Sequence, residues 1–391
     1  MSALSRTGQP RIAGVDAARG LALLGMMATH IVPLAAVNAT GDDEPTWAAT
    51  YFAGTASALF AVLAGASLAF VARSKAPHAV SRSVALRALM ITAIGLACGM
   101  LDTNVAVILT HYGLLFLAVI PFLWVRTSHL LMWAVGWLCL SPVVLYVAVP
   151  WVTRWVHPAD VGGSPTFTDL TRPATLVADL LFTGYYPVVV WVGFLLLGLW
   201  VGRLNVQRPP LALALLLGGA VVSAGARALS AALLTPAGRA ELAAAQGISL
   251  EQLDLGLSTG YYFGPVVQSG WWFALSAPHT SAPLDVLHVA GTAVAAIGAC
   301  QLLALGLAAL LGRYGEALLW PLSGAGSITL TLYVAHLVAL DALASVTASL
   351  PRVELYLWFA ALSALAGIVV KFCGIRGPLE ALIRAVARPT T

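Results

Sequence analysis

The sequence predicts an all-α protein: a polytopic transmembrane helix bundle of about ten membrane-spanning helices, with both termini in the cytoplasm. The first observation behind this prediction is composition. Of the 391 residues, 60% are hydrophobic and only 9% are charged, and the mean hydropathy is +0.90, whereas soluble domains carry roughly 25% charged residues. The other two observations are a series of long apolar stretches and an uneven distribution of basic residues.

Ten apolar stretches are long enough to cross roughly 30 Å of hydrocarbon. An even number of spans returns the C-terminus to the side of the N-terminus. The first stretch ends near AAVNA, which resembles a signal-peptide cleavage site, but we interpret it as an uncleaved span, because Asp16, Arg19 and His30 would be unusual in a discarded segment. The stretches cover residues 13–36, 50–72, 83–101, 105–125, 129–150, 184–202, 211–234, 285–311, 317–340 and 355–373.

The distribution of basic residues indicates which side is cytoplasmic, because lysine and arginine accumulate there. Loops of one side hold most acidic residues and, of the basic ones, only Arg154, Arg172, Arg239 and Arg352. The opposite helix ends and both tails carry Arg6, Arg11, Arg19, Arg73, Lys75, Arg82, Arg87, Arg126, Arg203, Arg208, Arg313, Lys371, Arg376, Arg384 and Arg388. Both termini are therefore predicted to be cytoplasmic.

The domain organisation follows from these spans. We predict a single transmembrane bundle over residues 13–373, between cytoplasmic tails at 1–12 and 374–391. The second tail contains a basic, amphipathic helix opened by Pro378. Such a helix is expected to lie on the anionic inner leaflet.

Two long outer loops, 151–183 and 235–284, are each too short for an independent domain. The second loop is predicted to contain two capped surface helices. Thr235 is a helix cap followed by Pro236 at the first helical position, and Ser249 with Gln252 forms a capping box. TGYYPVV at 183–189 and TGYYFGPVV at 259–267 echo each other. Their aromatic residues fit either an interfacial belt or a shared substrate vestibule.

The first span carries a polar edge. Arg19 and His30 are eleven residues apart, so a helix places them on nearly the same face, about 16 Å apart along its axis. Asp16 falls on that face too. Arg19 either pairs with Asp16 as a structural ion pair or faces a ligand.

Four histidines from four predicted spans lie at a similar depth, and an ionisable residue inside a membrane is a functional candidate by default. These are His30, His111, His288 and His336. Helical spacing places Tyr333 and His336 on one face. We therefore predict a polar cavity that opens outward, with histidine suited to act as a general base because its pKa lies near the operating pH.

Structural alternatives accompany these candidates. His111 and His288 also fit the role of buried hydrogen-bond partners between helices. Arg227 in the seventh span is interpreted as an ion-pair anchor, to Asp285 or Asp102. No H-x-x-x-H or H-E-x-x-H pair is present, so we predict no metal, and the absence of phosphate-loop motifs argues against coupling to ATP.

Several motifs carry a resemblance to a known family. VDAARGLAL, with ten residues between Arg19 and His30, resembles the first-helix signature of the integral-membrane acyltransferase superfamily. That superfamily includes acyltransferase type three and heparan-α-glucosaminide N-acetyltransferase. The segments most similar to its YeiB-type branch are GYYPVVVWVGFLLLGLWVGR at 184–203, APHTSAPLDVLHVAGTAVAAIG at 277–298, GSITLTLYVAH at 326–336 and RGPLEALIR at 376–384. The resemblance runs from about residue 11 to 388.

The resemblance implies a bundle in which cytosolic acyl-CoA, in the first place acetyl-CoA, donates an acyl group to an acceptor on the outer side. It implies that Arg19 lies near the CoA phosphates or thioester and that His30 acts as the base. We expect Asp16 and Arg376 to contribute to CoA binding as well. His336, His111 and Tyr333 are then expected to orient the base or to stabilise the oxyanion. One departure is that the acetyltransferase branch places its acting histidine in the loop after the first span, and loop 37–47 contains none.

We therefore expect a multi-pass protein of the bacterial plasma (inner) membrane that acts as an O- or N-acyltransferase on a glycan or glycolipid. Direct transfer and an acyl-histidine intermediate both stay open, as does a homodimer. Membrane lipid is an expected partner, and nucleic acid is not, because the net charge is only +4. The alternatives are a transporter or lipid flippase with a histidine-lined polar cavity, and a catalytically silent structural partner.

Overall fold

The computed structural model describes residues 12–39, 41–72, 76–156, 162–261, 263 and 266–387. Within these residues the chain forms a bundle of α-helices with a single two-stranded hairpin. Seven of the described helical segments are long and apolar enough to cross a membrane, or eight if one bent helix pair forms a single span. The predicted fold class, an all-α transmembrane bundle, is confirmed. The number of ten spans and the cytoplasmic termini stay predictions.

The first half of the chain consists of α1 (Ala13–Ile31), β1 (Ala35–Val37), β2 (Asp43–Pro45), α2 (Trp47–Phe52), α3 (Thr55–Ala72), α4 (Pro77–Cys98), α5 (Leu109–Ala118), η1 (Ile120–Trp124), α6 (Thr127–Val152), η3 (Phe167–Thr171), α7 (Pro173–Ala178), η4 (Asp179–Thr183) and α8 (Val188–Arg203). The second half consists of α9 (Pro209–Leu233), α10 (Pro236–Gln246), α11 (Leu250–Thr259), η5 (Gly270–Ala274), α12 (Pro283–Leu311), α13 (Arg313–Leu318), α14 (Trp320–Ala325), η6 (Gly326–Ile328), α15 (Thr329–Ala342), α16 (Ala344–Thr347), α17 (Arg352–Cys373) and α18 (Pro378–Val386).

Helix α1 lies at the centre of the bundle and packs against α3, α12, α14 and α17. Two glycines allow this close packing. A β-carbon at Gly20 would overlap the carbonyl oxygen of Leu322, and one at Gly326 would overlap that of Asp16. The α1 helix ends at Ile31, earlier than the apolar stretch 13–36, because Pro33 forces the preceding residue into an extended conformation. A hairpin, β1 paired antiparallel with β2, follows.

The apolar stretch 105–125 does not form the single membrane-crossing helix that the sequence predicted. Only Leu109–Ala118 is α-helical, and a short 3₁₀ segment containing Pro121 follows it. Proline lacks the backbone N–H that a continuing α-helix needs. A second break separates η4 from α8, where the two halves of the segment are bent by 54°. Both breaks lie in segments that contribute to the site described below.

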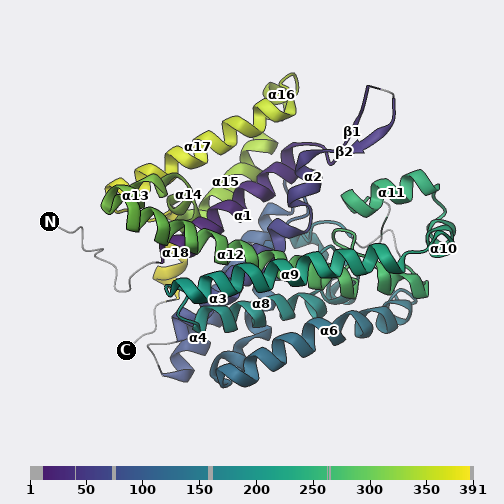
Figure 1. The fold of residues 1–391 in the computed structure, drawn as a ribbon, viewed down its shortest axis with the longest axis horizontal. Helices are drawn as coiled ribbons and strands as arrows, with labels where there is room; N and C mark the ends of the chain where they lie inside the picture. The colour runs from purple at the N-terminus through teal and green to yellow at the C-terminus, as the bar shows by residue number, and fades with distance from the viewer. Residues whose placement is uncertain are drawn as a thin grey trace.

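The predicted surface helices are present. The Thr235 side chain caps α10, and Ser249 with Gln252 forms the expected capping box at α11. Together with η5 these helices enclose a small core around Trp272, which is fully buried. Figure 1 shows α10, α11 and the β1–β2 hairpin at one end of the bundle, and α13 and α18 at the opposite end.

The C-terminal helix α18 begins at Pro378, as predicted, and is fastened to the bundle. Its Glu380 carboxylate accepts hydrogen bonds from the backbone N–H of Leu330 (2.8 Å) and of Thr331 (3.1 Å) and from the Thr331 hydroxyl (2.5 Å). It thereby caps the start of α15, where backbone N–H groups lack helical partners. Contact of α18 with a leaflet stays a prediction. Residues 1–11 and 388–391 of the predicted tails lie outside the described residues.

Candidate functional site

Near the first turn of α1, polar side chains form a compensated charge cluster. Arg19 donates from Nη1 to Asp16 Oδ1 (2.6 Å) and from Nη2 to Ser67 Oγ of α3 (2.8 Å). Lys371 of α17 places Nζ 3.8 Å from Asp16 Oδ2. Asp16 is 3% exposed, so its burial depends on these cations. The structural ion pair that was one interpretation of Arg19 and Asp16 is present.

Arg19 and Ser67 also line a cavity of about 150 Å³. Most of its walls are apolar and come from α3, α4 and α5; they include Phe60, Leu63, Ile91 and Phe116. Tyr112 of α5 forms a further wall, as does Thr329 at the start of α15. A cavity with one guanidinium and an apolar interior suits a ligand that joins an anionic group to a thin, largely apolar arm.

Near the last turn of α1, His30 meets α15. His30 Nδ1 lies 3.0 Å from His336 Nε2, and the two rings are stacked at 5.2 Å with 11° between their planes. The Tyr333 ring stands edge-on to both, at 5.1 Å from His336 and 6.1 Å from His30. The structure thus brings these three predicted site residues together. They form the outer cluster.

His111 reaches this cluster through a tyrosine. Its ring lies 5.5 Å from that of Tyr186, and neither of its ring nitrogens has a hydrogen-bond partner among the described residues. The side chains of Tyr186 and Tyr112 are both close enough to Tyr333 to interact electrostatically. Tyr112 therefore links the Arg19 cavity to the outer cluster.

The outer cluster has unused hydrogen-bonding capacity. The Tyr333 hydroxyl and Nδ1 of His336 are buried and make no hydrogen bond of regular geometry among the described residues, although they lie near the backbone of Ile108 and of Leu332 respectively. The neighbouring Tyr112 hydroxyl is buried without a partner in the same part of the chain. Most buried polar groups in native proteins are hydrogen bonded. Unpartnered groups at one place therefore indicate a ligand or ordered water there.

Two other predicted residues lie elsewhere in the bundle. His288 Nδ1 is 2.8 Å from Ser223 Oγ, between α12 and α9, so it serves as a hydrogen-bond partner between helices. Arg227 is exposed on α9, within electrostatic reach of Asp285 but without an ion pair to it within the described residues. Arg227 and Asp285 therefore interact at longer range than a contact ion pair. The Asp102 backbone N–H instead bonds the Asp341 carboxylate (3.0 Å).

Arg376 lies just before α18. The next residue, Gly377, abuts Thr331 so closely that a β-carbon there would lie 2.7 Å from its Oγ1. Arg376 is thus close to the start of α15, the same element that closes the Arg19 cavity. Arg87 and Arg384 are close enough at the α4–α18 contact to repel each other. Cations therefore gather at this end of the bundle, where an anionic ligand would be favoured.

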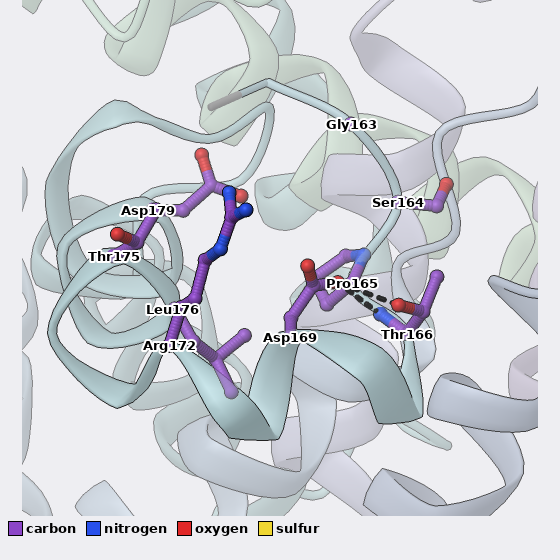
Figure 2. A pocket seen from close by; sticks show the side chains of 9 residues that line it. All are labelled: Gly163, Ser164, Pro165, Thr166, Asp169, Arg172, Thr175, Leu176 and Asp179. Carbon is purple, nitrogen blue, oxygen red and sulfur yellow. Dashed lines mark hydrogen bonds between the residues drawn. The ribbon is translucent and has the colours of Figure 1, made fainter. Parts of the chain in front are cut away.

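A polar pocket of about 230 Å³ lies in the segment before α8. Figure 2 shows the Arg172 side chain rising between Asp169 and Asp179. Asp169 Oδ2 accepts hydrogen bonds from the backbone N–H and the hydroxyl of Thr166, both at 2.7 Å. The lining residue Ser164 bonds the backbone of Val105 and Val107, just before α5 with His111. The pocket is thus adjacent to the segment that leads to the outer cluster.

His279 is a site residue that the sequence analysis missed. It lies in the loop between η5 and α12, with its ring 4.9 Å from Tyr185 and 5.7 Å from Tyr186, and close enough to His30 to interact electrostatically. Burial lowers the pKa of His279 to about 4. Its signal was the Pro278–His279 pair, which falls outside every apolar stretch and therefore escaped a search of membrane spans.

Among the described residues, no group of three or more His, Cys, Asp and Glu side chains is placed to hold a metal ion. The outer cluster itself offers imidazole and phenol groups, which can transfer protons, attack as nucleophiles and donate hydrogen bonds.

Comparison with known proteins adds a family. Residues 11–231 match the family model described as "Heparan-alpha-glucosaminide N-acetyltransferase, catalytic", a stretch that covers more than half of the 391 residues. The match includes Asp16, Arg19, His30 and His111, whereas Tyr333, His336, His279 and Arg376 lie beyond it. No curated protein matches the chain.

Proposed function

The chain belongs to the family of the heparan-alpha-glucosaminide N-acetyltransferase catalytic domain, and from this premise we propose that it transfers an acetyl or short acyl group from cytosolic acyl-CoA to a glycan or glycolipid acceptor on the extracytoplasmic side. The family is one of membrane acetyltransferases, and the apolar helices of this chain make it an integral membrane protein. We also propose the identity of the donor and of the acceptor, the side of the membrane on which each binds, and a bacterial inner-membrane location.

One observation carries the proposal. A single helix, α1, connects a cation beside an apolar cavity with a cluster of buried imidazole and phenol groups whose hydrogen-bonding capacity is only partly used. Arg19 and His30 mark its two ends, about 16 Å apart. A transferase that takes its donor from one side and its acceptor from the other needs such a path across the membrane.

The donor site is assigned to the Arg19 end. Acyl-CoA carries phosphate groups, which pair well with guanidinium groups, and Arg19 and Arg376 are the residues proposed to meet them. Asp16 holds Arg19 in place (2.6 Å), so its role in CoA binding is indirect. The cavity, with its apolar walls and Tyr112, suits the pantetheine arm and a short acyl group.

The transfer step is assigned to the outer cluster. His30 takes a proton from the acceptor as the acceptor's nitrogen or oxygen attacks the acyl carbonyl carbon. The C–S bond then breaks, and the CoA thiolate takes up the proton from His30. His336 orients His30 through the 3.0 Å contact, while Tyr333 and His111 donate hydrogen bonds to the oxyanion.

The acceptor is proposed to be an amino sugar within a glycan or glycolipid, because the family's name specifies a glucosaminide. The loops at 151–183 and 235–284 would admit it. The pocket of Figure 2 offers carboxylates, a guanidinium and hydroxyls, which are groups that hydrogen-bond sugars. An acetyl-histidine on His30, formed before the acceptor attacks, is the second route that the same groups permit.

The test uses purified protein in nanodiscs. Binding of acetyl-CoA is measured by calorimetry, and transfer of radiolabelled acetyl is measured with D-glucosamine and with membrane extract as acceptors. We expect saturable binding that weakens about tenfold in Arg19→Ala, the loss of one charge-assisted contact. Arg154→Ala, an exposed cation stacked on Trp151, is the matched control and should bind like the wild type.

Two outcomes would contradict the proposal. Absence of binding of any acyl-CoA by the wild type would leave the histidine-lined path as a transport route. Equal weakening in both arginine variants would remove Arg19 from the donor site. Proteoliposomes loaded with acetyl-CoA on one side only then test sidedness, with transfer expected when the donor faces the Arg19 end.

A further inference from the structure

His279 approaches the outer cluster from a different element than any of the predicted site residues. Its Nδ1 is buried and has no hydrogen-bond partner among the described residues. The charged and titratable groups that surround it are His30 of α1, Tyr185 and Tyr186 before α8, and Asp285 of α12. His279 thus presents an unpartnered imidazole nitrogen beside the proposed base.

The backbone of this loop is held in a costly conformation. His279 has φ +62° and Ser281 has φ +54°, in the left-handed region that side chains other than glycine seldom adopt. The loop is fixed there because the Ser281 backbone N–H donates to Asp285 Oδ2 (3.2 Å) and the Asp285 N–H donates to the Leu275 carbonyl (3.2 Å). Strained residues of this kind cluster at functional sites.

A small cavity lies beside His279. His279 and Asp285 line a cavity of about 10 Å³, which is near the smallest volume that holds one water molecule. The low pKa keeps the His279 ring neutral near pH 7. Because the same burial also weakens the hold of a bound ammonium on its proton, the neutral ring can accept that proton and does not retain it. The loop belongs to the 235–284 segment predicted to face outward.

With an amine acceptor, the proposed reaction releases one proton that does not end on the CoA sulfur. An amine acceptor is an ammonium near pH 7. It must lose one proton to expose its lone pair and a second as the new C–N bond forms. The balance is R–NH₃⁺ plus acyl–S–CoA giving R–NH–acyl, HS–CoA and H⁺. A hydroxyl acceptor loses a single proton, which ends on the CoA sulfur, so no proton is left over.

We propose that His279 removes this surplus proton: it takes the first proton from the bound ammonium and passes it to water on the outer side, and His30 then takes the second during attack. This role rests on the proposed function. It makes His279 a catalytic residue for acceptors that arrive protonated and an unnecessary one for acceptors that arrive neutral.

The backbone conformation offers a suitable variant. His279→Gly removes the imidazole while glycine adopts φ +62° without strain, so the loop should keep its shape. Ser281→Gly is the matched control, because it relieves the same kind of strain two residues away and leaves the ring in place. The two probe acceptors are D-glucosamine, which is an ammonium at pH 7, and methoxyamine, which is neutral at pH 7.

We expect His279→Gly to transfer acetyl to D-glucosamine about 100-fold more slowly than the wild type at pH 7, the usual contribution of one acid–base residue. The deficit should shrink as the pH rises and the free amine becomes the main form in solution. Transfer to methoxyamine and binding of acetyl-CoA should stay within about twofold, a difference of roughly 0.4 kcal/mol. Ser281→Gly should match the wild type throughout.

Each opposite result has a distinct meaning. A wild-type rate for His279→Gly with D-glucosamine at pH 7 overturns the role of His279 and leaves the proposed function standing. Equal losses with both amines, at every pH, also overturn it, because they indicate a structural role. A wild type that transfers acetyl to neither amine and binds no acetyl-CoA overturns the proposed function, and the role of His279 with it.

Discussion

The two ends of α1 bury polar groups in opposite ways. At the Arg19 end, the charges are compensated: Asp16 lies 2.6 Å from Arg19 and 3.8 Å from Lys371. At the His30 end, imidazole and phenol groups gather, and several buried nitrogen and oxygen atoms make no hydrogen bond of regular geometry among the described residues. The compensated cluster stabilises the fold through its ion pairs and offers a net positive charge, although Asp16 Oδ2 makes no hydrogen bond among the described residues. The unsatisfied cluster at the His30 end leaves more hydrogen-bonding capacity for a ligand.

Because of this difference, we expect substitutions at the two ends of α1 to have different effects. Substitutions at the compensated end should be seen mainly in stability and in binding of the anionic donor. Substitutions at the unsatisfied end should be seen mainly in turnover, with little loss of stability.

The largest effect is expected for His30→Ala. Removing the proposed base should lower acetyl transfer by about 10²- to 10⁴-fold, while acetyl-CoA binding persists because Arg19 is unchanged. His288→Ala is the control, since His288 bonds Ser223 between α12 and α9 and should retain turnover. Radiolabelled transfer in nanodiscs is the measurement. Similar losses in the two variants would refute the assignment of the chemistry to the outer cluster.

The next effect concerns the compensated end. Asp16→Ala leaves Arg19 and Lys371 without their shared carboxylate, and removing one partner of a buried ion pair costs about 3–5 kcal/mol. We expect a clear fall in melting temperature in detergent, together with weaker binding of acetyl-CoA. Asp254→Ala, which breaks an exposed pair with Arg239, should cost about 0–1 kcal/mol. Equal melting temperatures for the two variants would contradict a compensated buried cluster.

A smaller effect separates stability from turnover at one residue. The Tyr333 hydroxyl is buried near the backbone of Ile108 but makes no hydrogen bond of regular geometry among the described residues. Tyr333→Phe should therefore leave the melting temperature unchanged or raise it, because a poorly satisfied buried group costs about 1–3 kcal/mol. Transfer should fall about tenfold if the hydroxyl donates to the oxyanion. Tyr314→Phe, at a 64% exposed residue, should change neither. Loss of stability in Tyr333→Phe would show that the hydroxyl has a structural partner.

The smallest effect is expected where α18 meets α15. Glu380→Ala removes the acceptor for the backbone N–H groups of Leu330 and Thr331, and loss of a helix cap costs about 1 kcal/mol. Glu316→Ala, on the exposed face of α13, is the control. Limited proteolysis of the C-terminus, compared between the two variants, measures release of α18. Identical cleavage rates would argue against a cap that fastens this helix.

The sequence by itself predicted much of the bundle, because apolar runs and caps are local signals. The helices α6, α9, α12 and α17 begin and end within a few residues of their apolar stretches. Helical periodicity also placed Arg19 and His30 on one edge of α1 and Tyr333 with His336 on one face of α15. The sequence predicted one span over 105–125, whereas only Leu109–Ala118 is α-helical and the segment that contains Pro121 forms a 3₁₀ turn.

Only the tertiary structure decided which of these faces meet. His30 and His336 are in contact although they are 306 residues apart. The sequence predicted His288 at the same depth, yet His288 bonds Ser223 between α12 and α9. His279 comes from a loop, where no periodicity exists to reveal it. The physical reason is that periodicity specifies depth and direction on each helix, whereas neighbours depend on close packing, such as the contact of Gly326 with α1, that no local pattern encodes.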